Sequence, residues 1–206
     1  MERFDVSQWP RKKTYELFKD YADPTFNLTT NVEVTRLYKD CVENKRSFFL
    51  SSYYYLLKAA NEVTEFRLRI IDDEIWDIGN LDGASIVSRG NGDISFIYFQ
   101  NQPTFEEFME DASRRLHVHL QQDGHDPESF RRNLILHSVL PWVSFTSVKH
   151  PHKDLKDADM PRITNGKLIK DKNRIWMPTN VEAHHGLMDG YQMSRFFDKL
   201  ETYCAR

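Results

Sequence analysis

The sequence predicts an α+β protein, or a mixed-sheet sandwich, because helical and strand-forming stretches mix without the strict repeat of a parallel α/β protein. The chain has 206 residues, of which 40% are hydrophobic. This length and composition suit one domain with a substantial core. No Gly-, Ser- or Pro-rich linker divides the chain. We therefore expect residues 1–206 to form a single domain.

The first half of the chain predicts two helices, a group of strands and a third helix. Val34–Lys45 has helical spacing of its apolar positions, and Phe48–Val63 is strongly apolar and aromatic, which predicts a buried helix. Glu65–Asp77 and Ala84–Gln100 are rich in Ile, Phe, Val and Tyr, with turn signals at Gly83, Gly90 and Gly92. These segments predict strands.

A capping box predicts the start of the third helix, since Thr104 is followed three residues later by Glu107. We expect this helix to span Thr104–Gln121.

The second half predicts strands that lead into a final helix. Asn133–Val148 alternates and contains Pro141, which indicates a strand that bends or lies near an edge. Lys167–Ile169 and Arg174–Met177 predict a hairpin. Val181–His185 predicts a strand that turns at Gly186–Gly190, and an amphipathic helix is expected from Tyr191 onward.

Charge and cysteine content argue against several classes of protein. The formal net charge is −3, which gives no reason to expect nucleic acid or an anionic membrane as a partner. The two cysteines, Cys41 and Cys204, are far apart in sequence, so we expect free thiols and a cytoplasmic protein. The N-terminal residues have no apolar run, and we expect neither a signal peptide nor a membrane span.

The most informative segment runs from Val181 to Gly190, where a strand and a turn present the pattern HHxxxDG. Adjacent strand residues face opposite sides of a sheet, so only one of His184 and His185 can point into a given site. Histidine is the side chain best suited to act as a base near neutral pH. For an arbitrary pair of histidines a packing role would be the default, but the complete pattern before a C-terminal helix favours catalysis.

HHxxxDG resembles the active-site signature of chloramphenicol acetyltransferases, and four further segments carry the same resemblance along the chain. They are Trp9–Lys12 (WPRK), the pair EFR at 65–67 and IWD at 75–77, Ser138–Ser147 (SVLPWVSFTS) and Met160–Lys167 (MPRITNGK). The resemblance implies an acetyl-CoA-dependent O-acetyltransferase with a two-layer sandwich fold and a mixed sheet. Its default acceptor is chloramphenicol or a related alcohol, which implies a role in antibiotic resistance.

Catalytic roles follow from this resemblance residue by residue. It implies that His185 is the general base that takes the proton of the acceptor hydroxyl. Ser138 donates to the oxyanion of the tetrahedral intermediate, a contribution typically worth ~10²–10³ in rate, and Thr164 supports the same intermediate. Asp189 and Arg11 form an ion pair that holds the catalytic loop.

The resemblance also implies the partners of the reaction. Lys167 lies near the phosphates of CoA and Trp142 lies along the CoA channel, while the protein forms a homotrimer with sites at subunit boundaries. At three positions around the acceptor, Leu136, His150 and Arg162, the sequence departs from the family pattern. No metal site is expected, because the remaining histidines lack ligands at zinc-like spacing.

Two alternatives remain open at this point. One is the catalytic domain of a dihydrolipoyl acyltransferase, against which the PWVSFTS and WPRK segments argue. The other is a non-catalytic trimer of the same fold that binds a ligand without turnover.

Overall fold

The computed structural model describes residues 1–90, 92–121, 131–152, 155 and 157–206. The helices are α1 (Lys12–Phe18), α2 (Thr35–Glu43), α3 (Phe48–Asn61), a short 3-10 helix (Thr64–Arg67), α4 (Phe105–Gln121) and α5 (Gly190–Cys204). The strands are β1 (Glu2–Arg3), β2 (Thr25–Glu33), β3 (Leu68–Ile71), β4 (Glu74–Asp77), β5 (Asp82–Ser88), β6 (Ile94–Phe99), β7 (Leu134–Leu140), β8 (Arg162–Gly166), β9 (Ile169–Asp171) and β10 (Arg174–His184).

A seven-stranded sheet forms the centre of the molecule, in the order β2-β10-β8-β7-β5-β6, with β9 paired to β10. Strand β7 runs parallel to both β5 and β8, whereas the other pairs are antiparallel. A second, small sheet has the order β1-β4-β3. The mixed sheet and its helices confirm the predicted α+β sandwich.

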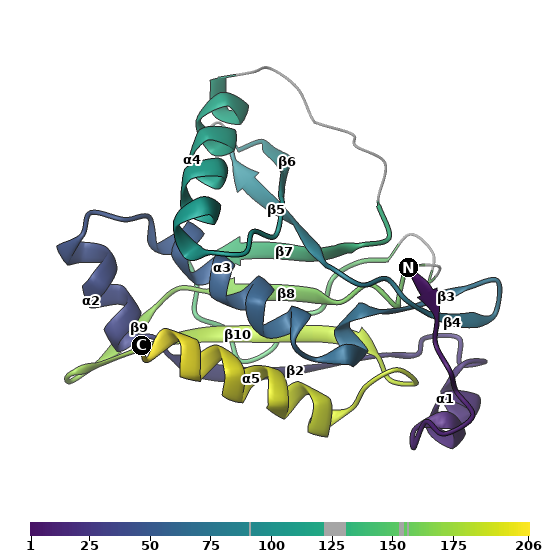
Figure 1. The fold of residues 1–206 in the computed structure, drawn as a ribbon. Coiled ribbons are helices and arrows are strands. Elements are labelled where there is room, and N and C mark those ends of the chain that lie inside the picture. The colour runs from purple at the N-terminus through teal and green to yellow at the C-terminus, as the bar shows by residue number, and fades with distance from the viewer. Residues whose placement is uncertain (91, 122–130, 153–154, 156) are drawn as a thin grey trace.

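Helices α3 and α5 lie across one face of the large sheet and form the second layer, with α4 beside β6 (Figure 1). Helix α3 is apolar around most of its circumference, so it is buried on several sides, and its residues Leu50, Tyr53 and Leu57 are core residues. Helix α5 contributes Phe196, which stacks on Phe66 at a centroid distance of 4.9 Å. The main core therefore lies between these helices and the sheet.

The opposite face of the sheet carries polar side chains. Cross-strand pairing places Thr29, Asn180, Thr164 and Ser138 in one row over β2, β10, β8 and β7. Because side chains alternate between faces along a strand, each of these residues has a core-facing neighbour.

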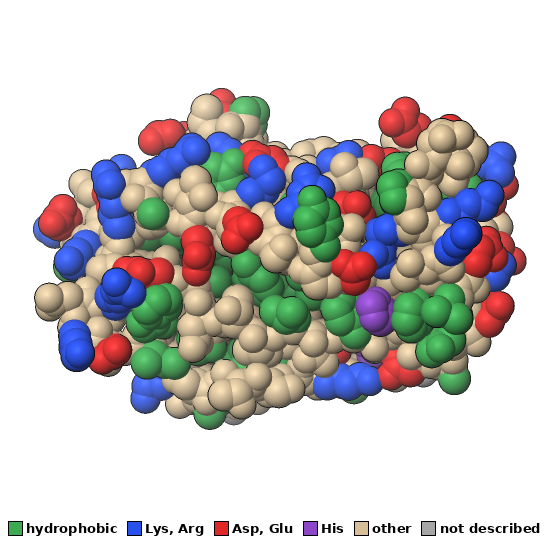
Figure 2. All heavy atoms as spheres, turned by 90° about the horizontal axis from the view of Figure 1, so that it is seen from below, with side chains coloured by type: hydrophobic (Ala, Val, Ile, Leu, Met, Phe, Trp, Pro, Cys, Tyr) green, Lys and Arg blue, Asp and Glu red, His purple; other side chains and the backbone are tan. Residues whose placement is uncertain are grey.

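Seen from below, the molecule shows acidic and basic side chains interspersed, with apolar side chains and a histidine between them (Figure 2).

The predicted helices at Val34–Lys45, Phe48–Val63 and Thr104–Gln121 correspond to α2, α3 and α4. At the start of α4, the backbone N–H of Glu107 donates to the Thr104 hydroxyl at 3.2 Å, and the Glu107 carboxylate accepts from Thr104. The capping box thus has the predicted geometry. None of the helices in the described ranges is both long and apolar enough to cross a membrane.

Other boundaries differ from the predictions. Gly83 lies inside β5, paired with Phe99 and Ile135, and not in a turn. A glycine suits this position because helix α3 passes so close that an added Cβ would lie 1.9 Å from the Tyr53 hydroxyl. The strand predicted over Asn133–Val148 ends at Leu140, directly before Pro141, which has no N–H to donate.

The predicted strands Arg174–Met177 and Val181–His185 are parts of one continuous strand, β10. Strand β2 and helix α1 were not predicted from the sequence. Both cysteines are free and buried.

Candidate active site

The two adjacent histidines lie at the end of β10 and occupy different environments. His184 is buried, and its Nδ1 accepts from the backbone N–H of Gly186 at 3.0 Å. Burial, with a smaller effect of the neighbouring His185, lowers the pKa of His184 to about 4. This imidazole is therefore neutral at physiological pH and is used in packing.

His185 is held between two aromatic rings. Its imidazole stacks on Phe18 at 4.3 Å and on Phe26 at 4.4 Å between ring centroids. Its Nδ1 lies 3.3 Å from the carbonyl oxygen of Met188, and since a carbonyl only accepts, Nδ1 carries the proton. The lone pair then resides on Nε2, which has no hydrogen-bond partner in the described part of the chain. This is the arrangement of an imidazole ready to accept a proton.

Arg11 links the N-terminal segment to the turn that follows β10. Its Nε donates to the carbonyl oxygen of Leu187 at 3.1 Å, and its Nη2 donates to that of His185 at 2.8 Å. Its Nη1 forms an ion pair with Asp189. The Arg11 side chain is almost fully buried, and through these three contacts its guanidinium connects the candidate base, the turn and the start of α5.

Asp189 is the N-cap of α5. Its carboxylate accepts from the backbone N–H of Tyr191 at 2.8 Å, and its own backbone N–H donates to the Gln192 side chain at 2.9 Å. Burial acts to raise the pKa of Asp189, but the hydrogen bonds from Tyr191 and Arg11 outweigh it and lower the pKa. The carboxylate thus serves the helix start and Arg11, not the imidazole of His185.

Ser138 and Thr164 lie opposite one another on the parallel strands β7 and β8. Both side chains are buried on the sheet face away from α3 and α5. The Thr164 hydroxyl lies 2.6 Å from Nε2 of His150, whose pKa is lowered mainly by burial. His150 therefore crosses the sheet face and contacts one of the two hydroxyl-bearing residues directly.

A cavity of about 280 Å³ opens beside Ser138. One of its walls is apolar, and the other contains polar and charged side chains. The apolar wall is formed by Ala84, Ile86, Phe96 and Leu136, and the polar wall includes His150, Asp157 and Arg162. Leu136, His150 and Arg162, the three acceptor positions at which the sequence departs from the family pattern, therefore all line this cavity.

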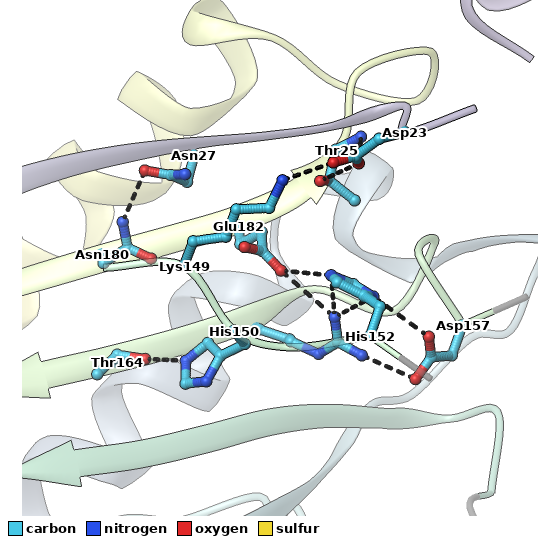
Figure 3. Close-up of polar contacts among 11 residues, drawn as sticks. Asp23, Thr25, Asn27, Lys149, His150, His152, Asp157, Thr164, Asn180 and Glu182 are labelled. Atoms are coloured by element: carbon cyan, nitrogen blue, oxygen red, sulfur yellow. Dashed lines mark hydrogen bonds and ion pairs between the residues drawn. The ribbon is translucent and has the colours of Figure 1, made fainter. Parts of the chain in front are cut away.

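The Arg162 guanidinium is neutralised within the wall. Its Nη2 donates to Asp157 at 2.8 Å, and its Nη1 lies 3.3 Å from Glu182 (Figure 3). The imidazole of His152 contacts Nη1 of Arg162 through both ring nitrogens, and its Nε2 lies 2.9 Å from Glu182. Two carboxylates and one imidazole thus surround this buried cation, which meets the requirement that buried charge be paired.

Within one chain, His185 and Ser138 are not brought together. Asn180 is in register with Thr164 and Ser138, and His185 lies five residues further along the chain. At ~3.3 Å per strand residue and ~4.8 Å per strand, the two residues are on the order of 15–20 Å apart. Direct proton transfer needs a separation of ~3 Å. His185 of one chain is therefore too far from Ser138 of the same chain for both side chains to contact one reacting group.

A second cavity, of about 400 Å³, lies at the end of the sheet near α3. Its lining includes Lys167, together with Phe48, Phe49, Pro141, Leu168 and Met177. Trp142 follows Pro141 directly and has a relative exposure of 72%. Such an exposed indole is not a core residue and is accessible to a bound molecule.

Sequence reasoning did not identify several residues of this region. Phe18 and Phe26 come from elements that were not predicted, so their contact with His185 had no signal in the sequence. His152, Asp157 and Glu182 formed no recognisable motif in the sequence.

Comparison with known proteins places the chain among related sequences and folds. Residues 1–201 match the family model for chloramphenicol acetyltransferase. A chloramphenicol acetyltransferase from Proteus mirabilis is 28% identical over 202 residues, which cover 97% of this chain and 93% of that protein.

Solved structures give the same result. A chloramphenicol acetyltransferase structure superposes with a TM-score of 0.88 and 29% identity, and the match covers 98% of this chain and 99% of that one. The structure of a probable dihydrolipoamide acetyltransferase from Listeria monocytogenes has a TM-score of 0.66 and 10% identity over 98% of this chain and 94% of that one. At that identity the likeness concerns the fold alone.

Proposed function

Because the chain belongs to the chloramphenicol acetyltransferase family, we propose that it transfers the acetyl group of acetyl-CoA to an acceptor hydroxyl, with His185 as general base. The acceptor oxygen attacks the thioester carbonyl while Nε2 of His185 takes its proton. The tetrahedral intermediate then collapses to the acetyl ester and CoA thiolate, which recovers the proton from His185. The observation that carries this proposal is the environment of His185.

The contacts of His185 suit this role in two ways. The proton on Nδ1 is directed at the Met188 carbonyl, which leaves Nε2 as the proton acceptor. The stacked rings of Phe18 and Phe26 restrict the imidazole from both faces, so little orientation has to be gained during the reaction.

Ser138 and Thr164 are proposed to stabilise the intermediate. A hydroxyl donor aimed at the developing oxyanion acts in a partly dry site, and its removal typically costs ~10²–10³ in rate. Ser138 borders the cavity beside its apolar wall. Thr164, on the neighbouring strand β8, is in register with Ser138.

Acetyl-CoA is proposed to enter from the second cavity. Its apolar lining suits the pantetheine arm. The ammonium group of Lys167 can pair with the CoA phosphates as a point charge, and the exposed indole of Trp142 offers a surface for the nucleotide end. No metal takes part in this scheme.

The separation between His185 and Ser138 supports a site shared between two copies of the chain. We place His185 of one subunit against the Ser138 cavity of the next, and closed repetition of this contact gives the homotrimer that the family resemblance implies. Residues 1–206 would then act as one acyltransferase domain, and the free cysteines fit a cytoplasmic location.

Chloramphenicol is the reference acceptor in this proposal, since the curated relatives carry its name. The apolar wall suits an aromatic ring, whereas Arg162 and His150 add donors that a purely apolar pocket would lack. We therefore expect acceptors with polar substituents opposite the ring to be used as well as chloramphenicol.

The test is thiol release from acetyl-CoA, measured with chloramphenicol, with a panel of other alcohols and without acceptor. Acceptor-dependent release by the wild-type chain, lost in His185→Ala, is the expected result. A lack of release with every alcohol would favour the non-catalytic alternative.

A further inference from the structure

A row of four buried polar side chains crosses the helix-covered face of the sheet, directly behind the candidate site. The row consists of Ser85 on β5, His137 on β7, Asn165 on β8 and Thr179 on β10. On this face the neighbouring side chains belong to the main apolar core. The proposed chemistry does not use any of the four residues.

The four side chains form one chain of hydrogen bonds. Nδ1 of His137 lies 2.9 Å from the Ser85 hydroxyl, and its Nε2 lies 2.7 Å from Oδ1 of Asn165. Asn165 Nδ2 donates to the Thr179 hydroxyl at 2.9 Å, and that hydroxyl donates to the carbonyl oxygen of Met177 at 3.2 Å.

Which atom donates in each of these hydrogen bonds follows from the groups that can only accept. The amide oxygen of Asn165 can only accept, so Nε2 of His137 carries the proton and Nδ1 accepts from Ser85. Burial lowers the pKa of His137 to about 4, which keeps the ring neutral. Every link therefore has a donor and an acceptor, and the chain ends on a backbone carbonyl.

When all the hydrogen bonds of a buried polar row are made, the row does more to specify the register of the strands than to stabilise the fold. Buried polar groups are costly unless paired, and apolar side chains of the same volume would fill the space without that cost. Each bond here requires a particular register between two strands. A slip of either strand would leave buried donors unpaired.

Strand alternation connects this row to the site. Ser138 follows His137, Thr164 precedes Asn165, and Asn180 follows Thr179, so three of the four members of the row have a polar neighbour on the opposite face of the sheet. His137 also borders both cavities. The bond from His137 to Asn165 crosses the parallel β7–β8 pair that carries Ser138 and Thr164.

We propose that Ser85, His137, Asn165 and Thr179 are positioning residues that set Ser138 relative to Thr164 for the transfer step. This inference rests on the proposed function, because Ser138 must act in the transfer for its position to matter. His137 is the central member, since it joins β5 and β8 through the strand between them.

The test compares His137→Gln with His137→Leu. Both variants lose the stacking of the imidazole on Tyr53, which has a centroid distance of 4.5 Å. Glutamine keeps an amide N–H where Nε2–H was and can still donate to Asn165, whereas leucine cannot. We expect His137→Leu to lower kcat ~10–10²-fold, in line with the cost of a small misplacement, with KM for both substrates little changed. His137→Gln should recover most of kcat.

A double variant separates positioning from general destabilisation. If His137 acts through Ser138, then adding Ser138→Ala to His137→Leu lowers kcat by much less than it does in the wild type. Tyr53→Phe is the matched control, because its hydroxyl has no hydrogen-bond partner among the described residues. It should leave kcat unchanged.

The outcomes are distinct. Equal kcat in the wild type, His137→Leu and His137→Gln overturns the positioning proposal alone, as does full additivity with Ser138→Ala. Absence of thiol release by the wild type with every acceptor overturns the proposed function and this inference together. If His137→Leu does not fold, Thr179→Val removes the last link with little change in volume, and an unchanged kcat in that variant also overturns the proposal.

Discussion

Nη2 of Arg11 donates to the backbone carbonyl of His185 at 2.8 Å, so the N-terminal segment fixes the main chain of the candidate base directly. The ion pair with Asp189 is only one of three contacts made by this guanidinium. Asp189, in turn, is also held by the start of α5. The two members of the pair are therefore not equivalent.

This asymmetry predicts that Arg11→Ala is more damaging than Asp189→Asn. Loss of Arg11 leaves two backbone carbonyls without donors, at a cost of ~1–3 kcal/mol in the free energy of unfolding. Asparagine at 189 can still cap α5, so its cost should be smaller. Chemical denaturation and turnover of the two variants check this order. If Asp189→Asn abolishes turnover while Arg11→Ala does not, the carboxylate serves His185 directly.

Replacement of His185 by alanine should lower turnover by at least ~10³, since general-base transfer and positioning are lost together. His184→Ala should retain more activity, because that ring is buried on the other side and contacts Gly186. Steady-state kinetics with acetyl-CoA compare the variants, with thermal stability as the control. The opposite order of activities would assign the base to His184.

Mixed assemblies test whether a site is shared between subunits. His185→Ala and Ser138→Ala should each have very low activity alone. When the two are refolded together in equal amounts, a shared site would combine an intact Ser138 with an intact His185 in about a quarter of the sites of a closed ring. Recovered activity near that fraction is the expected result, with sedimentation equilibrium reporting three chains. A mixture as inactive as its parents, or an active monomer, would contradict this arrangement.

The charged side chains in the cavity wall predict that substitutions at Arg162 and Glu182 have non-additive effects on stability. Arg162→Leu leaves the buried carboxylate of Glu182 without its cation and should destabilise the fold by ~3–5 kcal/mol. The double variant with Glu182→Leu removes both charges and should recover much of that loss. Denaturation midpoints of the two single variants and the double variant measure this. Purely additive losses would mean that the two charges do not depend on each other.

Stability should fall as pH is lowered from about 6.5 to about 4. Burial lowers the pKa of His137 and of His184 from 6.5 to about 4 in the folded chain. Over this interval the unfolded chain binds more protons than the folded one, so acid favours unfolding, and the effect levels off below about 4. Denaturant titrations at several pH values should give a shallower dependence for His137→Gln than for the wild type. Equal dependences would mean that His137 does not contribute.

Local patterns predicted some elements well because the signal and the cause lie in the same segment. Phe48–Asn61 forms a helix with the apolar run that buries it, and Thr104 caps α4 through a residue three positions away. Strand β2 gave no such signal, because Asn27, Thr29 and Asn31 alternate with residues of mixed character and the strand is defined by its pairing with β10.

In the candidate site, too, the features encoded in one segment could be recognised in the sequence, but those that depend on contacts between distant segments could not. The candidate base and its turn lie in one contiguous motif, whereas the stacking of Phe18 on His185 joins segments that are distant in sequence. The row from Ser85 to Thr179 depends on the register of four strands. No short pattern encodes that register, so these residues become visible only in the folded chain.

The cavity beside Ser138 is lined by parts of the chain with different constraints. Leu136, Ser138 and Arg162 lie on the central strands β7 and β8, while His150 and Pro151 come from the irregular segment after β7. Irregular segments tolerate exchange far better than central strands do. The range of alcohols used can thus diverge between relatives, or be redesigned, by exchanging a few residues around position 150 while the machinery of acyl transfer is inherited unchanged.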